Sequence, residues 1–402
     1  MRILYVIAAL QHPKIRGATR HYHFVRELSK HHDITLLSLV RSSVEPEAIS
    51  DIQSFTENLL TFNINGESSS ALADKVARLP LVGSYLEKSL KLARGVNQMK
   101  EAFLNLAKRE RFDLVLFHGK SIFSVIEKWS GLPIVTDFCD ATSLRIRTSM
   151  RFHSVVKRPY YFFKWLSVRR LERKMVRKTP HVAFISKRDR EAVLGPGDCS
   201  TLVPLGVDHE FWNRRVDHAD SRSVVFTGVM DYAPNHDAAI HLIEKILPPL
   251  REKIPGVEIV IVGRNPKGVL RRKAEQTPGV TVTGFVDDVR PYLEKAAVFA
   301  APIRFASGSQ NKVLEAMAMK VPVVATPIVS DGLRIDEYGE PPLLKAADDE
   351  AFVEALGGLL EDEQERMRLS EAGYRFVEQY YDWSHSAARL EQICQAALTG
   401  QG

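Results

Sequence analysis

Residues 298–326 read VFAAPIRFASGSQNKVLEAMAMKVPVVAT, and the architecture of the chain can be worked out from this segment. Two apolar runs, 298–302 and 322–326, have the length and composition of buried strands, and region 312–319 between them has a helical pattern. Parallel strands need a crossover connection, usually a helix. Because parallel sheets are covered by helices on both faces, the segment predicts a doubly wound α/β domain.

The same alternation of strands and helices extends in both directions from this segment. In the second half we predict further strands at 224–227, 257–262 and 280–285, and helices at 237–250, 271–275 and 289–296. In the first half we predict strands at 2–10, 33–39, 113–117, 134–137 and 182–185, and helices at 19–30 and 86–111. The chain therefore predicts two doubly wound, Rossmann-like α/β domains.

The boundary between the two domains is expected at VPLGVD, residues 203–208, where proline and glycine interrupt the pattern. The charge changes sign near the same point. Residues 1–200 contain 33 Lys and Arg against 19 Asp and Glu, whereas residues 201–402 contain 22 against 30. The basic half is expected to face an anionic partner. We predict domains at 1–205 and 206–375, followed by a C-terminal helix at 376–402.

The C-terminal segment is rich in aromatic residues, which need a groove to bury them. It either packs back on the first domain or caps the second, and the sequence allows both. The aromatic residues concerned are Phe376, Tyr380, Tyr381 and Trp383.

Length and composition exclude several classes of protein. The 402 residues are 45% hydrophobic and 26% charged, which is typical of globular chains and too long for one core. The cysteines Cys139, Cys199 and Cys394 lie far apart, so neither a disulfide framework nor a zinc cluster is predicted and a reducing compartment is expected. The apolar run 3–10 is interpreted as a strand rather than a signal peptide. No segment approaches the roughly 20 apolar residues that cross a bilayer.

Residues 145–178 combine basic and aromatic side chains. They include twelve Lys and Arg, Glu172 as the one acid, and the run YYFFKWL at 160–166. The favoured interpretation is an amphipathic helix on an anionic membrane surface. Nucleic-acid binding and a solvated basic helix with a buried aromatic face remain alternatives. The residues predicted to face the membrane are Lys164, Trp165, Arg169 and Arg170.

Ligands of doubly wound sheets bind at the carboxyl ends of the strands, which selects candidate residues in the first half. Arg16 and Gly17 precede a helix start that suits an anion, or form only a turn. His118 can hydrogen-bond a substrate hydroxyl, or pair with a backbone group. Asp137 and Asp140 can orient an acceptor or accept a proton, or serve as a helix cap and an ion-pair partner.

The second half contributes residues of the same kind. Gly228 follows a strand and lets a phosphate or sugar approach the backbone, and Asn235 is a candidate helix cap. Gly308 lies in a loop before a helix, where Lys312 adds a cation to the free N–H groups. Glu315 can accept hydrogen bonds from vicinal ribose hydroxyls; alternatively, it only favours the helix dipole while Lys312 is solvated.

Several of these segments together resemble the family 4 retaining glycosyltransferases of the GT-B fold. The resemblance covers nearly the whole chain and is most specific in the second domain. The segments are VPLGVD at 203–208, TG at 227–228, KVLEAMA at 312–318 and VPVVAT at 321–326. Regions 136–145 and 227–238 are similar to the subgroup associated with exosortase (PEP-CTERM) systems and exopolysaccharide gene clusters. This fold has two Rossmann-like domains that face each other across a cleft.

The resemblance implies transfer from a nucleotide-diphosphate-sugar, bound by the second domain, to a glycan or polyprenyl-linked acceptor on the first, with retained anomeric configuration. It implies no metal and no cofactor, and no nucleic-acid partner is expected. The basic aromatic stretch at 145–178 indicates an acceptor at the membrane and a cytoplasmic enzyme peripheral on the inner face of the cell membrane. The catalytic candidates are His118, Asp137 and Lys312. The donor-binding candidates are Arg16, Gly17, Gly228, Val286, Arg304, Gly308, Ser309, Lys312 and Glu315.

The chain departs from the family pattern at two places. Ser307 stands at the first of two positions, seven residues apart, where the family usually has paired carboxylates. The arginine and lysine that commonly clamp the diphosphate after TG are absent, since Val229 follows the glycine and Asn235 lies near the lysine position. Arg16, Arg304 or Lys312 would then neutralise the diphosphate. A sugar-nucleotide epimerase and a non-catalytic nucleotide-sugar-binding scaffold remain alternatives.

Overall fold

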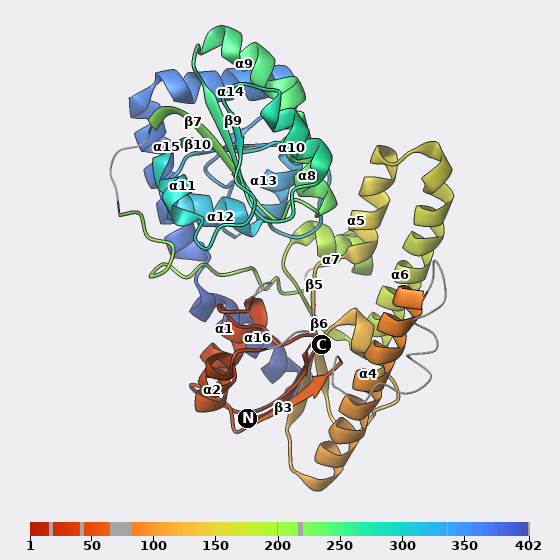
Figure 1. The fold of residues 1–402 in the computed structure, drawn as a ribbon. Coiled ribbons are helices and arrows are strands. Elements are labelled where there is room, and N and C mark those ends of the chain that lie inside the picture. Colours follow the sequence, from red (N-terminus) through yellow and green to blue (C-terminus); the bar gives the residue numbers. More distant parts are fainter. Residues whose placement is uncertain are drawn as a thin grey trace.

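A computed structural model of the chain describes residues 1–15, 19–40, 44–64, 83–198, 200–215, 220–335 and 337–400. The described residues form two separate parallel sheets of six strands each, flanked by helices (Figure 1). The predicted fold of two doubly wound α/β units is confirmed. Cys139 and Cys394 are free thiols, and Cys199 lies outside the described residues.

The first sheet has the order β3-β2-β1-β4-β5-β6, and all of its strand pairs are parallel. Its strands are β1 (Arg2–Ile7), β2 (Asp33–Val40), β3 (Asn58–Asn63), β4 (Leu114–His118), β5 (Ile134–Cys139) and β6 (His181–Phe184). The helices of this half are α1 (Arg20–Leu28), α2 (Pro46–Phe55), α4 (Gly83–Arg109), α5 (Thr142–Ser149), α6 (Arg158–Lys178) and α7 (Lys187–Leu194).

The second sheet has the order β12-β11-β10-β7-β8-β9 and is also parallel. Its strands are β7 (Asp220–Thr227), β8 (Glu258–Val262), β9 (Val280–Val282), β10 (Ala296–Ala301), β11 (Val323–Ala325) and β12 (Leu344–Lys345). Counted from its own first strand, each sheet has the order 3-2-1-4-5-6. The direction of winding therefore reverses between β1 and β4 in one sheet and between β7 and β10 in the other, where such sheets bind ligands.

One predicted helix of the second half is divided in the structure. The single helix predicted at 237–250 is α8 (Ala233–His241), a π-helical turn (Leu242–Ile246) and α9 (Leu247–Lys253). Pro234 lies in the first turn of α8, where its missing N–H costs no hydrogen bond. The other helices are α10 (Gly268–Glu275), α11 (Arg290–Lys295), α12 (Asn311–Ala318), α13 (Pro327–Leu333), α14 (Asp349–Glu361), α15 (Glu363–Tyr380) and α16 (Trp383–Thr399).

Side chains of β1 alternate between two hydrophobic cores because successive residues of a strand point to opposite faces. Ile3 and Tyr5 belong to the core that also holds residues of α1 and α16. Leu4 and Val6 belong to the other, which contains Phe103 of α4. All five side chains are fully buried. The first sheet is therefore covered on both faces, as a parallel sheet requires.

The aromatic residues of the C-terminal segment divide between the two halves. The buried Tyr381 donates its hydroxyl to the Leu333 carbonyl in the second half. In α16, which crosses back beside α1 (Figure 1), the Trp383 ring stacks on His23 with centroids 4.5 Å apart. The Val207 N–H donates to the Tyr381 carbonyl at 2.7 Å. The connection between the sheets and the returning chain thus run side by side.

Among the described residues, no helix is both long enough and apolar enough to cross a bilayer.

Candidate active site

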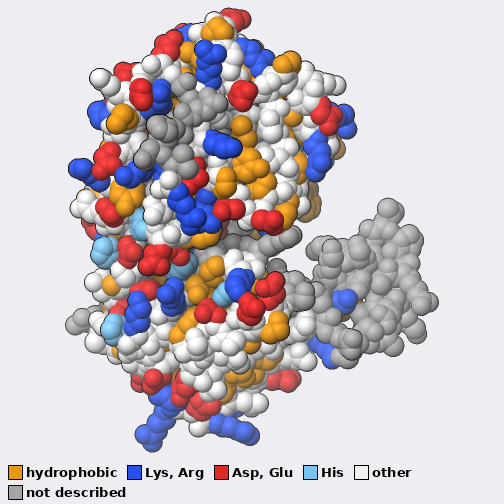
Figure 2. All heavy atoms as spheres, turned by 60° about the vertical axis from the view of Figure 1, so that its left-hand side comes forward, with side chains coloured by type: hydrophobic (Ala, Val, Ile, Leu, Met, Phe, Trp, Pro, Cys, Tyr) orange, Lys and Arg blue, Asp and Glu red, His pale blue; other side chains and the backbone are white. Residues whose placement is uncertain are grey.

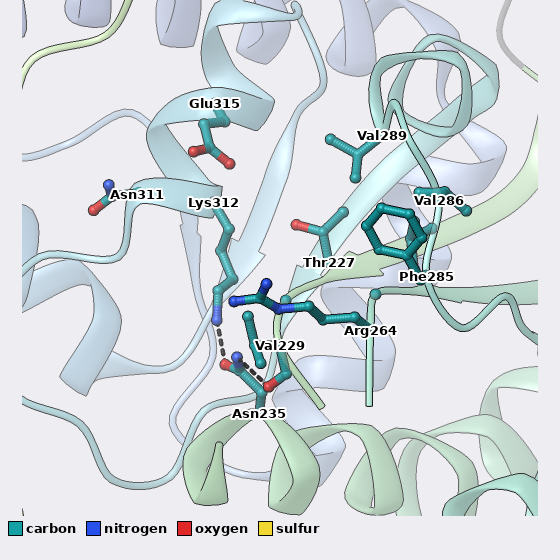
Figure 3. Close-up of a pocket in the computed structure, with 13 residues that line it drawn as sticks. Thr227, Val229, Asn235, Arg264, Phe285, Val286, Val289, Asn311, Lys312 and Glu315 are labelled. Atoms are coloured by element: carbon teal, nitrogen blue, oxygen red, sulfur yellow. Dashed lines mark hydrogen bonds between the residues drawn. The ribbon is translucent and has the colours of Figure 1, made fainter. Parts of the chain in front are cut away.

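A cavity of about 360 Å³ opens at the carboxyl ends of β7 and β8, beside the point where the second sheet reverses its winding (Figure 3). Helix α12 and the segment after β9 complete its walls. Doubly wound sheets bind ligands at this place. The lining residues are Thr227, Gly228, Val229, Asn235, Val262, Gly263, Arg264, Phe285, Val286, Val289, Asn311, Lys312 and Glu315.

Two glycines allow the loops after β7 and β8 to touch. Gly228 and Gly263 have φ angles of 155° and 152°, in the region that favours glycine. A Cβ atom at Gly263 would lie 1.7 Å from the Gly228 carbonyl oxygen. The Met230 N–H also donates to the Arg264 carbonyl at 2.9 Å. The backbone of these two loops therefore forms the floor of the cavity, and their close contact fixes its position.

Lys312 is held by an amide rather than by a carboxylate. Its ammonium donates to Asn235 Oδ1 (Figure 3). It also lies 5.2 Å from the centre of the Phe226 ring. Asn235 Nδ2 in turn donates to the Val229 carbonyl at 3.1 Å. Asn235 is thus inside the first turn of α8, and it positions Lys312 instead of capping the helix.

Burial perturbs both titratable groups of α12 in the cavity. It lowers the pKa of Lys312 to about 8, while nearby Glu315 acts in the opposite direction. It raises the pKa of Glu315 to about 7, against the effect of Lys312. Both groups therefore titrate close to neutral pH, which is typical of functional sites.

The chemistry of the cavity changes from one end to the other. Phe285, Val286 and Val289 form an apolar wall suited to a flat ring. Glu315 offers acceptors for a diol, and Lys312 offers a positive charge. The arrangement matches a ligand that joins a planar base, a ribose and an anionic group.

The structure brings together four of the predicted donor-binding residues. Gly228, Val286, Lys312 and Glu315 all line this cavity. Arg16 and Gly17 lie outside the described residues.

The other three predicted donor-binding residues do not line the cavity. Arg304 pairs with both carboxylate oxygens of Asp237, at 2.9 and 2.6 Å. The Gly308 N–H donates to Asp189 at 2.8 Å, and the Ser309 hydroxyl donates to a backbone carbonyl. Polar groups that were expected to face a diphosphate are therefore engaged within the protein in this arrangement.

A second cavity, of about 270 Å³, lies at the carboxyl ends of β1, β4 and β5. His118 Nδ1 pairs with the Asp137 carbonyl at 2.8 Å, so Nδ1 carries the proton and Nε2 is left as an acceptor. Burial lowers the pKa of His118 and keeps the ring neutral. The lining residues are Ala8, His118, Gly119, Lys120, Ser121, Asp137, Phe138, Asp140, Thr142 and Met175.

The Asp137 carboxylate is engaged within the protein. It is fully buried and accepts hydrogen bonds from Arg20 Nε at 2.7 Å and from the Cys139 N–H at 2.9 Å. Arg20 also donates to the carbonyls of Val203 and Pro204, at 2.9 and 2.7 Å. Asp137 thereby anchors the connection between the sheets, a role that the sequence did not indicate.

Three potential metal ligands, His21, His118 and Asp137, have ligand atoms within 4.8 Å of one another. The Nδ1 atoms of His21 and His118 pair with the Tyr5 hydroxyl, at 2.6 Å, and with a backbone carbonyl, and the Asp137 carboxylate accepts hydrogen bonds from Arg20. A guanidinium on the carboxylate opposes a cation electrostatically. We interpret the cluster as a hydrogen-bonded network of the first half.

The loop before α12 contacts the first half of the chain. The Ser307 hydroxyl donates to Asp140, which lines the second cavity, at 2.7 Å. One residue further on, the Gly308 N–H donates to Asp189 of α7. The two halves of the chain are thus in direct contact at the edge of the second cavity.

Some residues of the first cavity were not predicted from the sequence as donor-binding residues. Among them are Arg264, Phe285 and Asn235, which is the partner of Lys312. Arg264 follows Gly263 directly after β8, the position that Gly228 and Val229 occupy after β7. The rule that ligands bind after parallel strands therefore points to Arg264 as well.

A known family model matches the part of the chain that contains the first cavity. Residues 221–362 match the model of the family Glycosyl transferases group 1. A phosphatidyl-myo-inositol mannosyltransferase of Mycolicibacterium smegmatis is 31% identical over 190 residues, 46% of this chain and 47% of that protein. Its Mycobacterium leprae counterpart is 31% identical over 183 residues, 44% of this chain and 47% of that protein. The match thus spans about half the length of these relatives.

Solved structures share the fold of the whole chain. Anabaena HepE in complex with UDP-glucose aligns with a TM-score of 0.64 and 13% identity, covering 98% of this chain and 100% of that one. Sucrose-phosphate synthase from Thermosynechococcus elongatus aligns with a TM-score of 0.68 and 14% identity, covering 100% of both chains. The two sheets are those of a GT-B fold.

Proposed function

We propose that the protein is a retaining glycosyltransferase that moves a sugar from a nucleotide-diphosphate-sugar to a hydroxyl of an acceptor. One observation carries the proposal: the cavity beside β7 and β8 holds a base-sized apolar wall, Glu315 and Lys312 within the segment that matches a glycosyltransferase family. The similarity to mannosyltransferases and to a UDP-glucose complex supports a sugar nucleotide as the donor.

In this proposal each group binds one part of the donor. The base lies against Phe285 and Val286, Glu315 accepts hydrogen bonds from the ribose hydroxyls, and Lys312 binds the diphosphate. The sugar extends toward the second cavity, where His118 Nε2 accepts a hydrogen bond from one of its hydroxyls.

In the reaction, the bond between the anomeric carbon and the diphosphate oxygen breaks, and the nucleoside diphosphate leaves with the electron pair. The acceptor oxygen forms its bond to the same carbon on the same face and passes its proton to the departing phosphate oxygen. Retention of this kind requires no nucleophile from the protein. The main contribution of the site is to stabilise charge on the leaving diphosphate and to orient the acceptor.

The test is a transfer assay. The purified protein is incubated with radiolabelled UDP-, GDP- and ADP-sugars and with membranes of its source, and label is counted in the lipid and glycan fractions. We expect transfer from one donor, lost in Glu315→Ala and kept in Glu275→Ala, a control on exposed α10. Recovery of an epimerised donor would support an epimerase instead, and binding without turnover would support a scaffold.

We further propose that the acceptor is presented at an anionic membrane by an apolar tip, defined as Val155, Val156, Tyr160 and Phe163. These side chains are between 63% and 90% exposed. Residues 141–171 contain eight Lys and Arg and no Asp or Glu. Exposed apolar groups ringed by cations match the interface of an anionic bilayer.

The apolar tip differs from the membrane-facing residues predicted from sequence. Lys164 and Arg170 are exposed, as a membrane surface requires, whereas Trp165 and Arg169 are partly buried, with the guanidinium 5.2 Å from the centre of the indole. Helix α6 runs from the apolar tip to Met175 in the second cavity. It therefore leads from the proposed membrane surface to the second cavity, toward which the donor sugar is proposed to extend.

Vesicle sedimentation tests this surface. We expect binding to vesicles with phosphatidylglycerol but not to pure phosphatidylcholine, and loss of binding in Val156→Glu with Phe163→Glu. Met367→Glu, at a side chain that is 66% exposed on α15, is the matched control. Equal binding by the double variant would contradict the proposal.

A further inference from the structure

The first cavity contains an arginine that has no counterpart in the expected donor-binding set. Arg264 lies directly after β8, is partly buried, and lines the cavity. Lys312, Asn235 and Glu315 line the same cavity (Figure 3). Within the part of the chain that the structure describes, the Arg264 guanidinium makes no hydrogen bond or ion pair.

The backbone of Arg264 is held in place from both sides. Its carbonyl accepts the Met230 N–H at 2.9 Å. The next residue, Asn265, has a φ of 58° and donates its amide to Asp231 at 3.1 Å. Gly263 makes room for the close approach of the β7 loop. The position of Arg264 is therefore built by contacts that do not use its side chain.

Two cations that line one partly desolvated cavity repel each other unless an anion lies between them. Lys312 donates here to an amide oxygen, and within the described part of the chain it makes no ion pair with a carboxylate. A guanidinium binds two non-bridging phosphate oxygens through parallel hydrogen bonds, which an ammonium does not. The pair is thus suited to an anion with several charged oxygens, such as a diphosphate.

We propose that Arg264 supplies, together with Lys312, the positive charge that binds the donor's diphosphate. The loop after β7 has Val229 after its glycine, whereas the neighbouring loop after β8 carries a guanidinium at the equivalent place. The inference rests on the proposed function, because it assumes a nucleotide-diphosphate-sugar in this cavity.

Calorimetry with ligands of different phosphate content tests the assignment. Nucleoside, monophosphate and diphosphate of the base preferred by the wild type are titrated into wild type, Arg264→Ala, Arg264→Gln and Arg264→Lys. We expect roughly 10- to 100-fold weaker diphosphate binding in the alanine and glutamine variants, the range for hydrogen bonds to charged groups. Nucleoside affinity should stay within about twofold, and lysine should restore only part of the loss.

Arg272→Ala is the matched control, because Arg272 is exposed on α10 beyond the same strand. Thermal unfolding of each variant checks that it is folded. Unchanged diphosphate affinity in Arg264→Ala would overturn the inference, and so would an equal loss for nucleoside and diphosphate. A wild type that binds no nucleoside diphosphate would overturn the proposed function too, which separates the two failures.

Discussion

Donor binding should depend on pH in a bell-shaped manner with its maximum near pH 7.5. Glu315 must be ionised to accept hydrogen bonds from ribose hydroxyls, and its pKa is about 7. Lys312 must be protonated to bind a diphosphate, and its pKa is about 8. Affinity therefore rises as pH increases through the first value and falls as it passes the second.

The magnitude follows from the two pKa values. The fraction of molecules with both groups charged is about 0.6 at pH 7.5 and about 0.1 at pH 6 and at pH 9. If only this form binds, the association constant at either extreme should be about one sixth of its maximum. Because the groups interact, the measured values belong to the pair.

Calorimetry from pH 6 to pH 9 measures this profile. The ligand is an intact nucleotide-sugar, whose diphosphate is esterified at both ends and keeps its charge across this range. Glu315→Gln should bind more weakly and lose the acidic limb while keeping the alkaline one, whereas Glu275→Gln should keep the whole bell. A flat wild-type profile, or an acidic limb that survives in Glu315→Gln, would refute the reasoning.

Three substitutions should lower stability, each measured by urea denaturation. Gly263→Ala should cost at least about 3 kcal/mol, because the added Cβ meets a backbone oxygen and the φ angle favours glycine; a loss below about 1 kcal/mol would contradict this. Asp137→Asn should cost about 3–5 kcal/mol by leaving Arg20 charged and buried without its carboxylate, and wild-type stability would show that the pair is dispensable. Trp383→Ala should cost about 3–5 kcal/mol, because it removes the buried indole of α16 that stacks on His23 of α1. An unchanged denaturation midpoint would contradict this contribution.

The sheets were predictable where strands are apolar along their whole length. All six residues of β10 are buried, and the sequence AAVFAA shows it. The edge strand β3 alternates half-buried and exposed residues, and β12 has only two residues, so neither produces an apolar run. Both were therefore absent from the prediction.

The sequence predicted the parts of the candidate site whose positions depend on one domain alone. Lys312 and Glu315 share α12 and follow a strand, so their position is local information. Gly308 also follows that strand, yet its N–H is bound by Asp189, 119 positions earlier in the chain. The docking of the two halves decides which polar groups of the loop already have partners within the protein. No local sequence pattern predicts that docking.

Helix α16 also bears on how the protein is made. It lies beside α1 and against β4, β5 and β6, so it completes one face of the first sheet. The ribosome must add about 200 residues between the end of β6 and Trp383. At ordinary elongation rates this takes roughly 10 to 40 seconds, during which that apolar face stays uncovered. The domain that is synthesised first is therefore finished last, and nascent chains halted before α16 should be held by chaperones.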